Sequence, residues 1–276
     1  MPSEALVVVD VFDDVATLTI NRPHKLNALN YAVVGELSQM LHRIDSDDEI
    51  RAVVITGSGD RAFSAGADIA EFSGSIAKGG PAALREFVIP GQQMTHQIQY
   101  FGKPVIAAVN GIAYGGGCEI VEACHLAIAA DHATFAKPEI KLGFPPCFGG
   151  TQRLPRLVGR KRALKMILTA EPISAFDAHA VGLVNDVVPA ADLRRAARSL
   201  ARAILDKSPG SIRACIASVE RGLNVSMEDG LAIEAAQFGV VAETDDVREG
   251  VAAFNEKRSA VFTHRRNGAV DLHGRP

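Results

Sequence analysis

Hydrophobic and polar positions follow two different periods in the N-terminal part of the chain. Residues 5–12 (ALVVVDVF) and 15–22 (VATLTINR) alternate or run apolar on either side of two aspartates, which predicts a β-hairpin. Residues 30–46 follow a helical period, with Asn30 as the expected N-cap. Their apolar positions at helical spacing are Val33, Val34, Leu37, Met40, Leu41 and Ile44. The chain is therefore predicted to begin with a hairpin and an amphipathic helix.

Fully apolar runs then alternate with helical patterns. Residues 81–101 predict a helix that is broken or kinked near Pro90, because proline lacks a backbone N–H. Buried strands are predicted at residues 51–57, 103–111, 125–131, 133–137 and 182–188. Strands that alternate with helices predict a mostly parallel sheet covered by helices, and thus an α/β fold.

The pattern changes near residue 190. From there to residue 262 we find helical patterns with breaks at residues 208–211 and 221–224, and no convincing strand. We therefore expect a core of residues 1–190 that carries any active site, followed by a helical region of residues 191–262. Residues 263–276 have little to bury and are predicted to be disordered.

The composition is that of a globular protein. Hydrophobic residues make up 47% of the 276 positions and charged residues 22%, which argues against a disordered or membrane-embedded chain. The net charge of -3 gives no electrostatic reason to expect nucleic acid or an anionic membrane as a partner. Aromatic residues make up 5% and tryptophan is absent, so few side chains can stack on bases. We therefore expect no nucleic-acid partner and no membrane partner.

The N-terminal apolar stretch does not resemble a signal peptide, because Asp10 interrupts it and no basic segment precedes it. No apolar run approaches the about 20 residues that a membrane-spanning helix needs. The four cysteines show no CxxC pairing, which suits a reducing compartment. We expect a cytoplasmic protein, or the processed form of an organelle protein. No metal is expected either, because no His, Cys or Asp cluster has a metal-site spacing.

Residues 111–120 (GIAYGGGCEI) place three glycines directly before a predicted helix. Glycines between a strand and a helix let backbone N–H groups approach a ligand closely, and the helix dipole adds positive potential there. Such a site stabilises an oxyanion, with each well-placed donor worth about 3–4 kcal/mol in a transition state. A second donor could come from residues 63–69 (FSAGADI), which follow a predicted strand. The alternative is a packing motif in which the glycines let a helix lie close to a strand.

Two glutamates are candidates for acid–base chemistry. Glu119 is expected in the first turn of the helix after the glycines, and Glu139 follows the predicted strand 133–137 behind a proline. Strand ends on the same side of a sheet could bring the two carboxylates together. Addition of water needs such a pair, one to take a proton from water and one to deliver a proton to carbon. The spacing alone leaves other candidates open, namely Glu122, Asp68 and Asp131.

Several segments together resemble the enoyl-CoA hydratase/isomerase (crotonase) family, in the right order and at close to the right spacing. They are residues 21–30 (NRPHKLNALN), 63–69, 103–120, 137–159 (KPEIKLGFPPCFGGTQRLPRLVG) and 173–188 (ISAFDAHAVGLVNDVV). The resemblance covers residues 4 to about 262. It implies a spiral of repeated ββα units followed by a C-terminal helical region used in trimer formation. The implied assembly is a homotrimer or a dimer of trimers.

The resemblance also implies roles for individual residues. In the family, two backbone N–H groups hold the thioester oxygen, at positions that match Ala67 and Gly116. Glu119 would orient and activate water, and Glu139 would exchange the proton at C2. Hydratases of the family carry two glutamates twenty residues apart, as here (139 minus 119), whereas isomerases often lack one. The resemblance therefore implies an enoyl-CoA hydratase, which adds water reversibly and syn to a trans-2-enoyl-CoA to give the (3S)-3-hydroxyacyl-CoA.

Coenzyme A, as part of the substrate and not as a separate cofactor, is expected across residues 24–29 and 64–69. The positions whose backbone would receive it are Lys25, Leu26, Ala28, Ala65 and Ile69. Lys257 matches a family lysine that approaches the CoA phosphates, often from a neighbouring subunit. Taken alone, Lys257 could equally be a solvated helix lysine.

The sequence departs from the usual hydratase pattern near the expected acyl pocket. Residues 143–152 read GFPPCFGGTQ where many relatives read close to GIIPGFGGTQ, which places Pro146 and Cys147 beside the expected acyl pocket, and Tyr114 precedes the glycine triplet where Leu is common. Together with Asp68, Tyr114 and Cys147 are candidates for substrate contact. These departures could narrow or polarise the pocket, so the resemblance does not imply an acyl-chain length. Cys147 has no base nearby in the sequence and is interpreted as a buried spectator.

Other patterns point to different functions. Residues 53–62 (VVITGSGDRA) imitate a dinucleotide-binding fingerprint, but no helix is predicted to open there. The basic stretch 153–165 could place Arg153, Arg156 and Arg160 on one helix face and suit an RNA-binding relative. The overall acidity and scarce aromatics favour a solvated or subunit-contact face instead. A further alternative is a crotonase-fold isomerase or dehydratase that acts on an unusual acyl-CoA.

Overall fold

The computed structural model describes residues 5–262, and the chain divides into two compact units. The first unit extends to Arg202 and the second begins at Ala203. Helix α9 (Leu193–Leu205) belongs to the first unit as far as Arg202, whereas the sequence placed the boundary at 190/191. The tail predicted to be disordered lies outside the described residues.

A six-stranded sheet forms the centre of the first unit. Its order is β1-β2-β3-β5-β7-β10, and every neighbouring pair is parallel except β1 and β2. The strands are β1 (Val7–Phe12), β2 (Val15–Ile20), β3 (Ala52–Gly57), β5 (Val105–Val109), β7 (Leu126–Ala130) and β10 (Asp186–Val188). Every residue of β3 and β5 is buried, as expected for parallel strands covered on both faces. The predicted hairpin and the mostly parallel pairing are confirmed.

A second sheet is made of short strands that the sequence analysis largely missed. Its order is β4-β6-β8-β9, and only β8 had been predicted. The strands are β4 (Ala62–Ser64), β6 (Ile112–Tyr114), β8 (Thr134–Ala136) and β9 (Ile173–Ser174). β4, β6 and β8 each follow a long strand of the first sheet and lead toward a helix. This repeated ββα succession is the spiral that the family resemblance implied.

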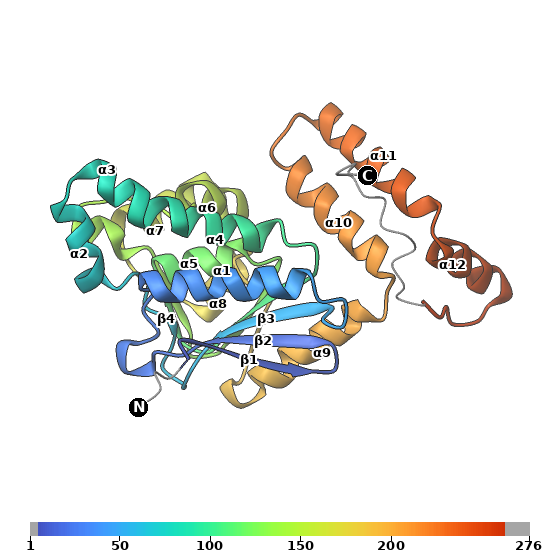
Figure 1. Cartoon of the computed structure of the whole chain (residues 1–276), viewed down its shortest axis with the longest axis horizontal. Helices are drawn as coiled ribbons and strands as arrows, with labels where there is room; N and C mark the ends of the chain where they lie inside the picture. The colour runs from blue at the N-terminus through green and yellow to red at the C-terminus, as the bar shows by residue number, and fades with distance from the viewer. Residues whose placement is uncertain (1–4, 263–276) are drawn as a thin grey trace, which may run out of the picture. The chain divides into compact units, whose positions relative to one another are not determined.

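The helix after the hairpin forms as its pattern predicted. α1 (Tyr31–Asp45) begins behind Asn30, whose side chain accepts a hydrogen bond of 2.9 Å from the Val33 N–H. Its buried face consists of Val33, Val34, Leu37, Leu41 and Ile44. Burial of each such side chain stabilises the fold by about 1.5–3 kcal/mol. The helix lies against β1, β2 and α4 (Ile89–Gln99), as Figure 1 shows.

The predicted break near Pro90 is present as a turn of π-helix. α2 (Ile69–Ala77) and α3 (Gly80–Ala83) precede the π turn η2 (Leu84–Val88), which leads into α4. The Ile89 N–H bonds back to the Leu84 carbonyl, five residues earlier, just before the proline that has no N–H to donate. The turn buries the side chain of Phe87.

The remaining helices of the first unit are short. They are η1 (Pro23–Lys25), α5 (Gly116–Ala123), η3 (Pro138–Leu142), α6 (Gly150–Val158), α7 (Arg160–Thr169), α8 (Ala175–Ala180) and η4 (Ala190–Asp192). The second unit contains α10 (Pro209–Gly222), α11 (Met227–Ala242) and α12 (Asp245–Glu256). Their N-caps are Ser208, Ser226 and Thr244, and the predicted breaks fall at the ends of α10. Within residues 5–262, no helix combines the length and apolarity needed to span a bilayer.

Candidate active site

A small cavity lies where β4 and β6 give way to helices. Its volume is about 70 Å³. All four residues predicted to be catalytic line it, namely Ala67, Gly116, Glu119 and Glu139. Ala65, Ile69 and Cys147 line it as well. Among the described residues, its lining does not include Lys25, Leu26, Ala28, Asp68 or Tyr114.

The loop after β4 is held close to two other segments. The Ala65 N–H bonds to the Leu26 carbonyl at 2.9 Å, and the Leu29 N–H bonds to the Gly66 carbonyl at 2.7 Å. Gly66 has φ +94°, and a Cβ on it would lie 2.8 Å from the Tyr114 carbonyl oxygen and 3.3 Å from the Gly116 nitrogen. Only glycine fits this position without strain, so the loop can approach the start of α5.

Two backbone amides at this junction are free to bind an oxygen atom. Within residues 5–262, neither the Ala67 N–H nor the Gly116 N–H has an acceptor in the protein. Gly116 is the first residue of α5, where helical N–H groups lack partners and the helix dipole is positive. Both residues line the same cavity. This arrangement can stabilise an oxyanion.

The three glycines of the triplet have different structural tasks. Gly115 takes a left-handed φ of +50° that turns the chain into α5. Gly117 packs against β4: a Cβ on it would overlap the Ser64 carbonyl oxygen and lie 2.8 Å from the Ser64 Cβ. The packing interpretation of the triplet therefore applies to Gly117, whereas the N–H group without an acceptor belongs to Gly116.

Gly117→Ala is expected to lower the free energy of unfolding by about 1–3 kcal/mol, because the added methyl group collides with backbone that cannot yield locally. Gly74→Ala on α2 is the matched control. Gly74 is exposed and has no atom within 4 Å of the added Cβ. Because alanine favours a helix more than glycine does, Gly74→Ala should leave the free energy of unfolding unchanged or raise it slightly. Urea unfolding of both variants measures the difference. Equal stabilities would contradict the packing role of Gly117.

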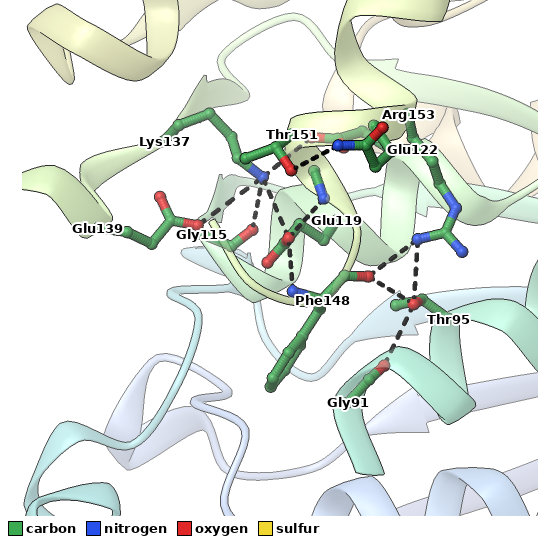
Figure 2. Close-up of polar contacts among 12 residues, drawn as sticks. Gly91, Thr95, Gly115, Glu119, Glu122, Lys137, Glu139, Phe148, Thr151 and Arg153 are labelled. Atoms are coloured by element: carbon green, nitrogen blue, oxygen red, sulfur yellow. Dashed lines mark hydrogen bonds and ion pairs between the residues drawn. The ribbon is translucent and has the colours of Figure 1, made fainter. Parts of the chain in front are cut away.

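Glu119 and Glu139 sit in different environments, as Figure 2 shows. Glu119 lies in the first turn of α5 and is 1% exposed, and its Oε1 accepts hydrogen bonds from the Phe148 N–H (2.8 Å) and the Gly150 N–H (2.7 Å). Glu139 lies on η3 and is 7% exposed, and neither of its oxygens has a hydrogen-bond partner among the described residues. Burial raises the pKa of Glu139, Lys137 opposes that rise, and Glu119 adds to it.

A fully buried lysine, which the sequence analysis missed, lies at the centre of the carboxylates. The Lys137 Nζ is 3.1 Å from the Glu122 Oε1, 3.8 Å from the Glu139 Oε1 and 4.0 Å from the Glu119 Oε1 (Figure 2). Burial alone would lower the pKa of Lys137, but the carboxylates of Glu119 and Glu122 outweigh it and raise the pKa. A Cβ on Gly150 would lie 2.5 Å from this Nζ, so glycine leaves room for the ammonium.

Lys137 did leave a signal in the sequence. It follows directly on β8 and stands two residues before Glu139, next to the proline that begins η3. Nothing in the local pattern shows that its side chain is buried among acids.

Of the three acids that the spacing left open, only Glu122 joins this cluster. Its side chain is fully buried, and it does not line the cavity within the described residues. Burial raises its pKa to about 7, Lys137 opposes that rise and Glu119 adds to it. Asp68 instead pairs with Arg22 at 2.9 Å; burial alone would raise its pKa, but the hydrogen bond from Arg22 holds the pKa below its ordinary value. Asp131 is exposed.

Cys147 lines the cavity and is partly buried. Burial, with help from Glu119, raises the pKa of its thiol to about 12, so the thiol stays protonated near neutral pH. Tyr114 lies on β6, and its hydroxyl bonds with the Thr134 hydroxyl at 3.2 Å.

The predicted helix face shared by Arg153, Arg156 and Arg160 is wrong. α6 ends at Val158, and Gly159 with φ +83° separates it from α7. Arg153 turns inward and donates to the Phe148 carbonyl at 2.9 Å (Figure 2). It therefore supports the loop that binds Glu119 instead of facing a nucleic acid.

The segment predicted to receive coenzyme A lies on and after η1. Asn27, which the sequence analysis did not single out, is fully buried and fixes this segment. Its side chain accepts from the Arg22 N–H at 3.0 Å and donates to the Ala62 carbonyl at 2.7 Å. Lys257 ends α12 in the second unit, and its contact with a CoA phosphate stays a prediction.

The model of the family described as enoyl-CoA hydratase/isomerase matches residues 11–265. The chain belongs to this family. It is 41% identical to the short-chain-enoyl-CoA hydratase of Clostridium acetobutylicum over 252 residues, 91% of this chain and 95% of that relative. It is also 41% identical to the crotonyl-CoA hydratase of Syntrophomonas wolfei over 256 residues, 93% of this chain and 97% of the relative.

Solved structures of this family share the fold. The crystal structure of an enoyl-CoA hydratase from Bacillus anthracis superposes with a TM-score of 0.89 at 36% identity, covering 95% of this chain and all of that one. An enoyl-CoA hydratase subunit from Geobacillus kaustophilus gives a TM-score of 0.88 at 34% identity, covering 95% and 99%. The crotonase fold expected from the resemblance is thus confirmed.

Proposed function

We propose that this chain is an enoyl-CoA hydratase that adds water reversibly and syn to a trans-2-enoyl-CoA, giving the (3S)-3-hydroxyacyl-CoA. One observation carries the proposal. Two buried carboxylates in different environments, Glu119 and Glu139, share a cavity with the free N–H groups of Ala67 and Gly116. Relatives at 41% identity that are named short-chain and crotonyl-CoA hydratases support it. An isomerase would need only one of the carboxylates.

The geometry suggests a separate role in hydration for each group of the site. The Ala67 and Gly116 N–H groups receive the thioester oxygen, which gains negative charge as water attacks C3, and each donor contributes about 3–4 kcal/mol. Glu119, fixed by two backbone N–H groups, accepts the proton of the water as the C3–O bond forms. Glu139, whose raised pKa favours the protonated acid, gives its proton to C2. Dehydration runs through the same steps in reverse.

The proposal extends to substrate binding and assembly. Coenzyme A would lie across residues 24–29 and 64–69, which are hydrogen-bonded to each other, with Lys257 of a neighbouring subunit at its phosphates and no separate cofactor. A homotrimer or dimer of trimers is proposed from the resemblance. Large apolar side chains exposed on the second unit support such contacts, among them Leu223, Met227, Phe238 and Phe254. We place the reaction in cytoplasmic fatty-acid β-oxidation.

Crotonyl-CoA tests the proposal directly. Purified protein should remove the absorbance of the conjugated enoyl thioester and yield (3S)-3-hydroxybutyryl-CoA, identified by chiral analysis of the product. Conversion of 3-enoyl-CoA to 2-enoyl-CoA without hydration would favour an isomerase. No turnover of short, medium or branched enoyl-CoAs, together with a salt-sensitive RNA shift, would favour a non-catalytic relative.

A further inference from the structure

A second cavity lies beside the candidate active site, on the far side of Phe87. Its volume is about 680 Å³, against about 70 Å³ for the active-site cavity. Its lining combines apolar residues of α1, α2 and α4, among them Val34, Phe72 and Pro90, with polar ones such as Glu71 and Glu86. Among the described residues, Phe87 alone lines both cavities, so the two cavities meet at this residue.

Phe87 belongs to a row of four aromatic rings. Its ring centroid lies 3.8 Å from that of Phe72 and 4.8 Å from that of Phe148, and Phe72 lies 5.7 Å from Phe144. Phe144 and Phe148 line the active-site cavity, whereas Phe72 lines the larger one. The row therefore joins residues from the linings of the two cavities, and Phe87 is the member that belongs to both linings.

The neighbours of Phe87 hold its ring in place. Phe87 is 6% exposed and lies on the π turn Leu84–Val88, a type of irregular helical turn that often occurs at functional sites. Phe148 is tied to Glu119 through its backbone N–H, and its ring packs so closely on Gly91 that a Cβ there would overlap it (Figure 2). Neither ring can swing aside without disturbing these contacts.

The smaller cavity leaves little room for a long acyl chain, because its volume of about 70 Å³ is about one tenth of that of the larger cavity. A longer chain would have to continue through the position of the Phe87 ring.

We propose that Phe87 sets the acyl-length limit of this chain, and that the larger cavity binds the alkyl tail of a longer 2-enoyl-CoA once the Phe87 ring is removed. The inference rests on the proposed function but concerns chain length, not the reaction. It predicts a wild-type preference for crotonyl-CoA over decenoyl-CoA. Each methylene that a pocket admits or rejects is worth about tenfold or more in kcat/KM.

The experiment compares wild type with Phe87→Ala on crotonyl-, hexenoyl-, octenoyl- and decenoyl-CoA. The ratio of kcat/KM for decenoyl-CoA to that for crotonyl-CoA should rise at least about tenfold in Phe87→Ala. Phe87→Leu, which keeps more of the packing, should raise the ratio less and guards against a misfolded alanine variant. Isothermal titration with butyryl-CoA and decanoyl-CoA reports the same shift without turnover.

Phe101→Ala is the matched control. Phe101 is 3% exposed and, among the described residues, is absent from the lining of both cavities, so its truncation lowers stability without changing the ratio. A wild type that hydrates decenoyl-CoA as well as crotonyl-CoA would overturn the inference and leave the hydratase proposal standing. An unchanged ratio and unchanged decanoyl-CoA affinity in both Phe87 variants would overturn it too. Absence of all turnover by wild type would count against the proposed function, while the titrations would still test the role of Phe87.

Discussion

Glu139→Gln is expected to lower kcat for hydration of crotonyl-CoA by about 10²- to 10⁴-fold. An amide cannot deliver the proton that C2 needs. Among the described residues, no group is hydrogen-bonded to the Glu139 carboxyl group that could deliver the proton in its place. Glu119→Gln should lose activity on the same scale, because the general base is gone. The amide oxygen at position 119 can still accept the hydrogen bonds from Phe148 and Gly150, so folding should be preserved.

Exchange with deuterium separates the roles of the two glutamates. In heavy water, the C2 proton of butyryl-CoA should exchange with wild type and with Glu119→Gln, but not with Glu139→Gln. Glu36→Gln is the control, because Glu36 is a carboxylate on α1 that bonds to the Val7 N–H and lies outside the cavity lining among the described residues. The double variant should lose less than the product of the single losses, since the two groups act in one step. Retained exchange in Glu139→Gln would reverse the assignment.

The same pair sets the pH dependence of hydration. Burial raises the pKa of Glu139, so its protonated form persists to higher pH than for a free glutamic acid. The value of kcat/KM for hydration should therefore fall as pH rises through this pKa. In Glu139→Gln, this fall at high pH should be absent. The measured values belong to the coupled pair and not to either residue alone.

The sequence predicted the parts of the fold whose pattern is long enough to recognise. The hairpin and α1 contain several repeats of their period, and the long strands β3, β5 and β7 are apolar runs of five or six residues. The short strands β4, β6 and β9 contain two or three residues, too few for any period to appear. These short strands place the loop of Ala67 beside the start of α5. The geometry of the site could therefore not be predicted from the sequence pattern alone.

The motifs of the family located the four residues that line the cavity, but not the residues that surround them. Lys137 and Phe87 look ordinary in the sequence, a lysine before a proline and one phenylalanine among 12. Their importance comes from burial among acids and between two cavities, which depends on segments far apart in the chain. The glycine triplet shows the same limit, because only the structure distinguishes the packing glycine from the one with the free amide.

Lys137→Met is expected to lower the free energy of unfolding by about 3–5 kcal/mol near neutral pH. The substitution keeps most of the side-chain volume but leaves three buried carboxyl groups without the cation between them. Lys78→Met provides a matched control. Lys78 lies 3.1 Å from Glu86, the same distance as Lys137 from Glu122, but its side chain is 63% exposed. That pair should contribute less than about 1 kcal/mol.

The pH dependence distinguishes lost charge from lost packing. The pKa of Glu122 is raised by burial to about 7 from the ordinary 4.5, so the folded protein keeps a proton that the unfolded chain releases. This group therefore makes the fold less stable as pH rises from about 4.5 to about 7. Lys137 restrains that rise in pKa, and without it the pKa values of Glu122 and Glu139 should increase further. The stability lost in Lys137→Met should accordingly be larger at about pH 8 than at about pH 5.5.

Urea unfolding at both pH values measures this difference. Adding Glu122→Gln to Lys137→Met should recover part of the lost stability, most of all at about pH 8, because it removes a buried acid that has lost its partner. The same rescue should be absent when Glu122→Gln is combined with Lys78→Met. Equal losses for Lys137→Met and Lys78→Met, or a loss at position 137 that does not change with pH, would show that Lys137 acts through its volume and not through its charge.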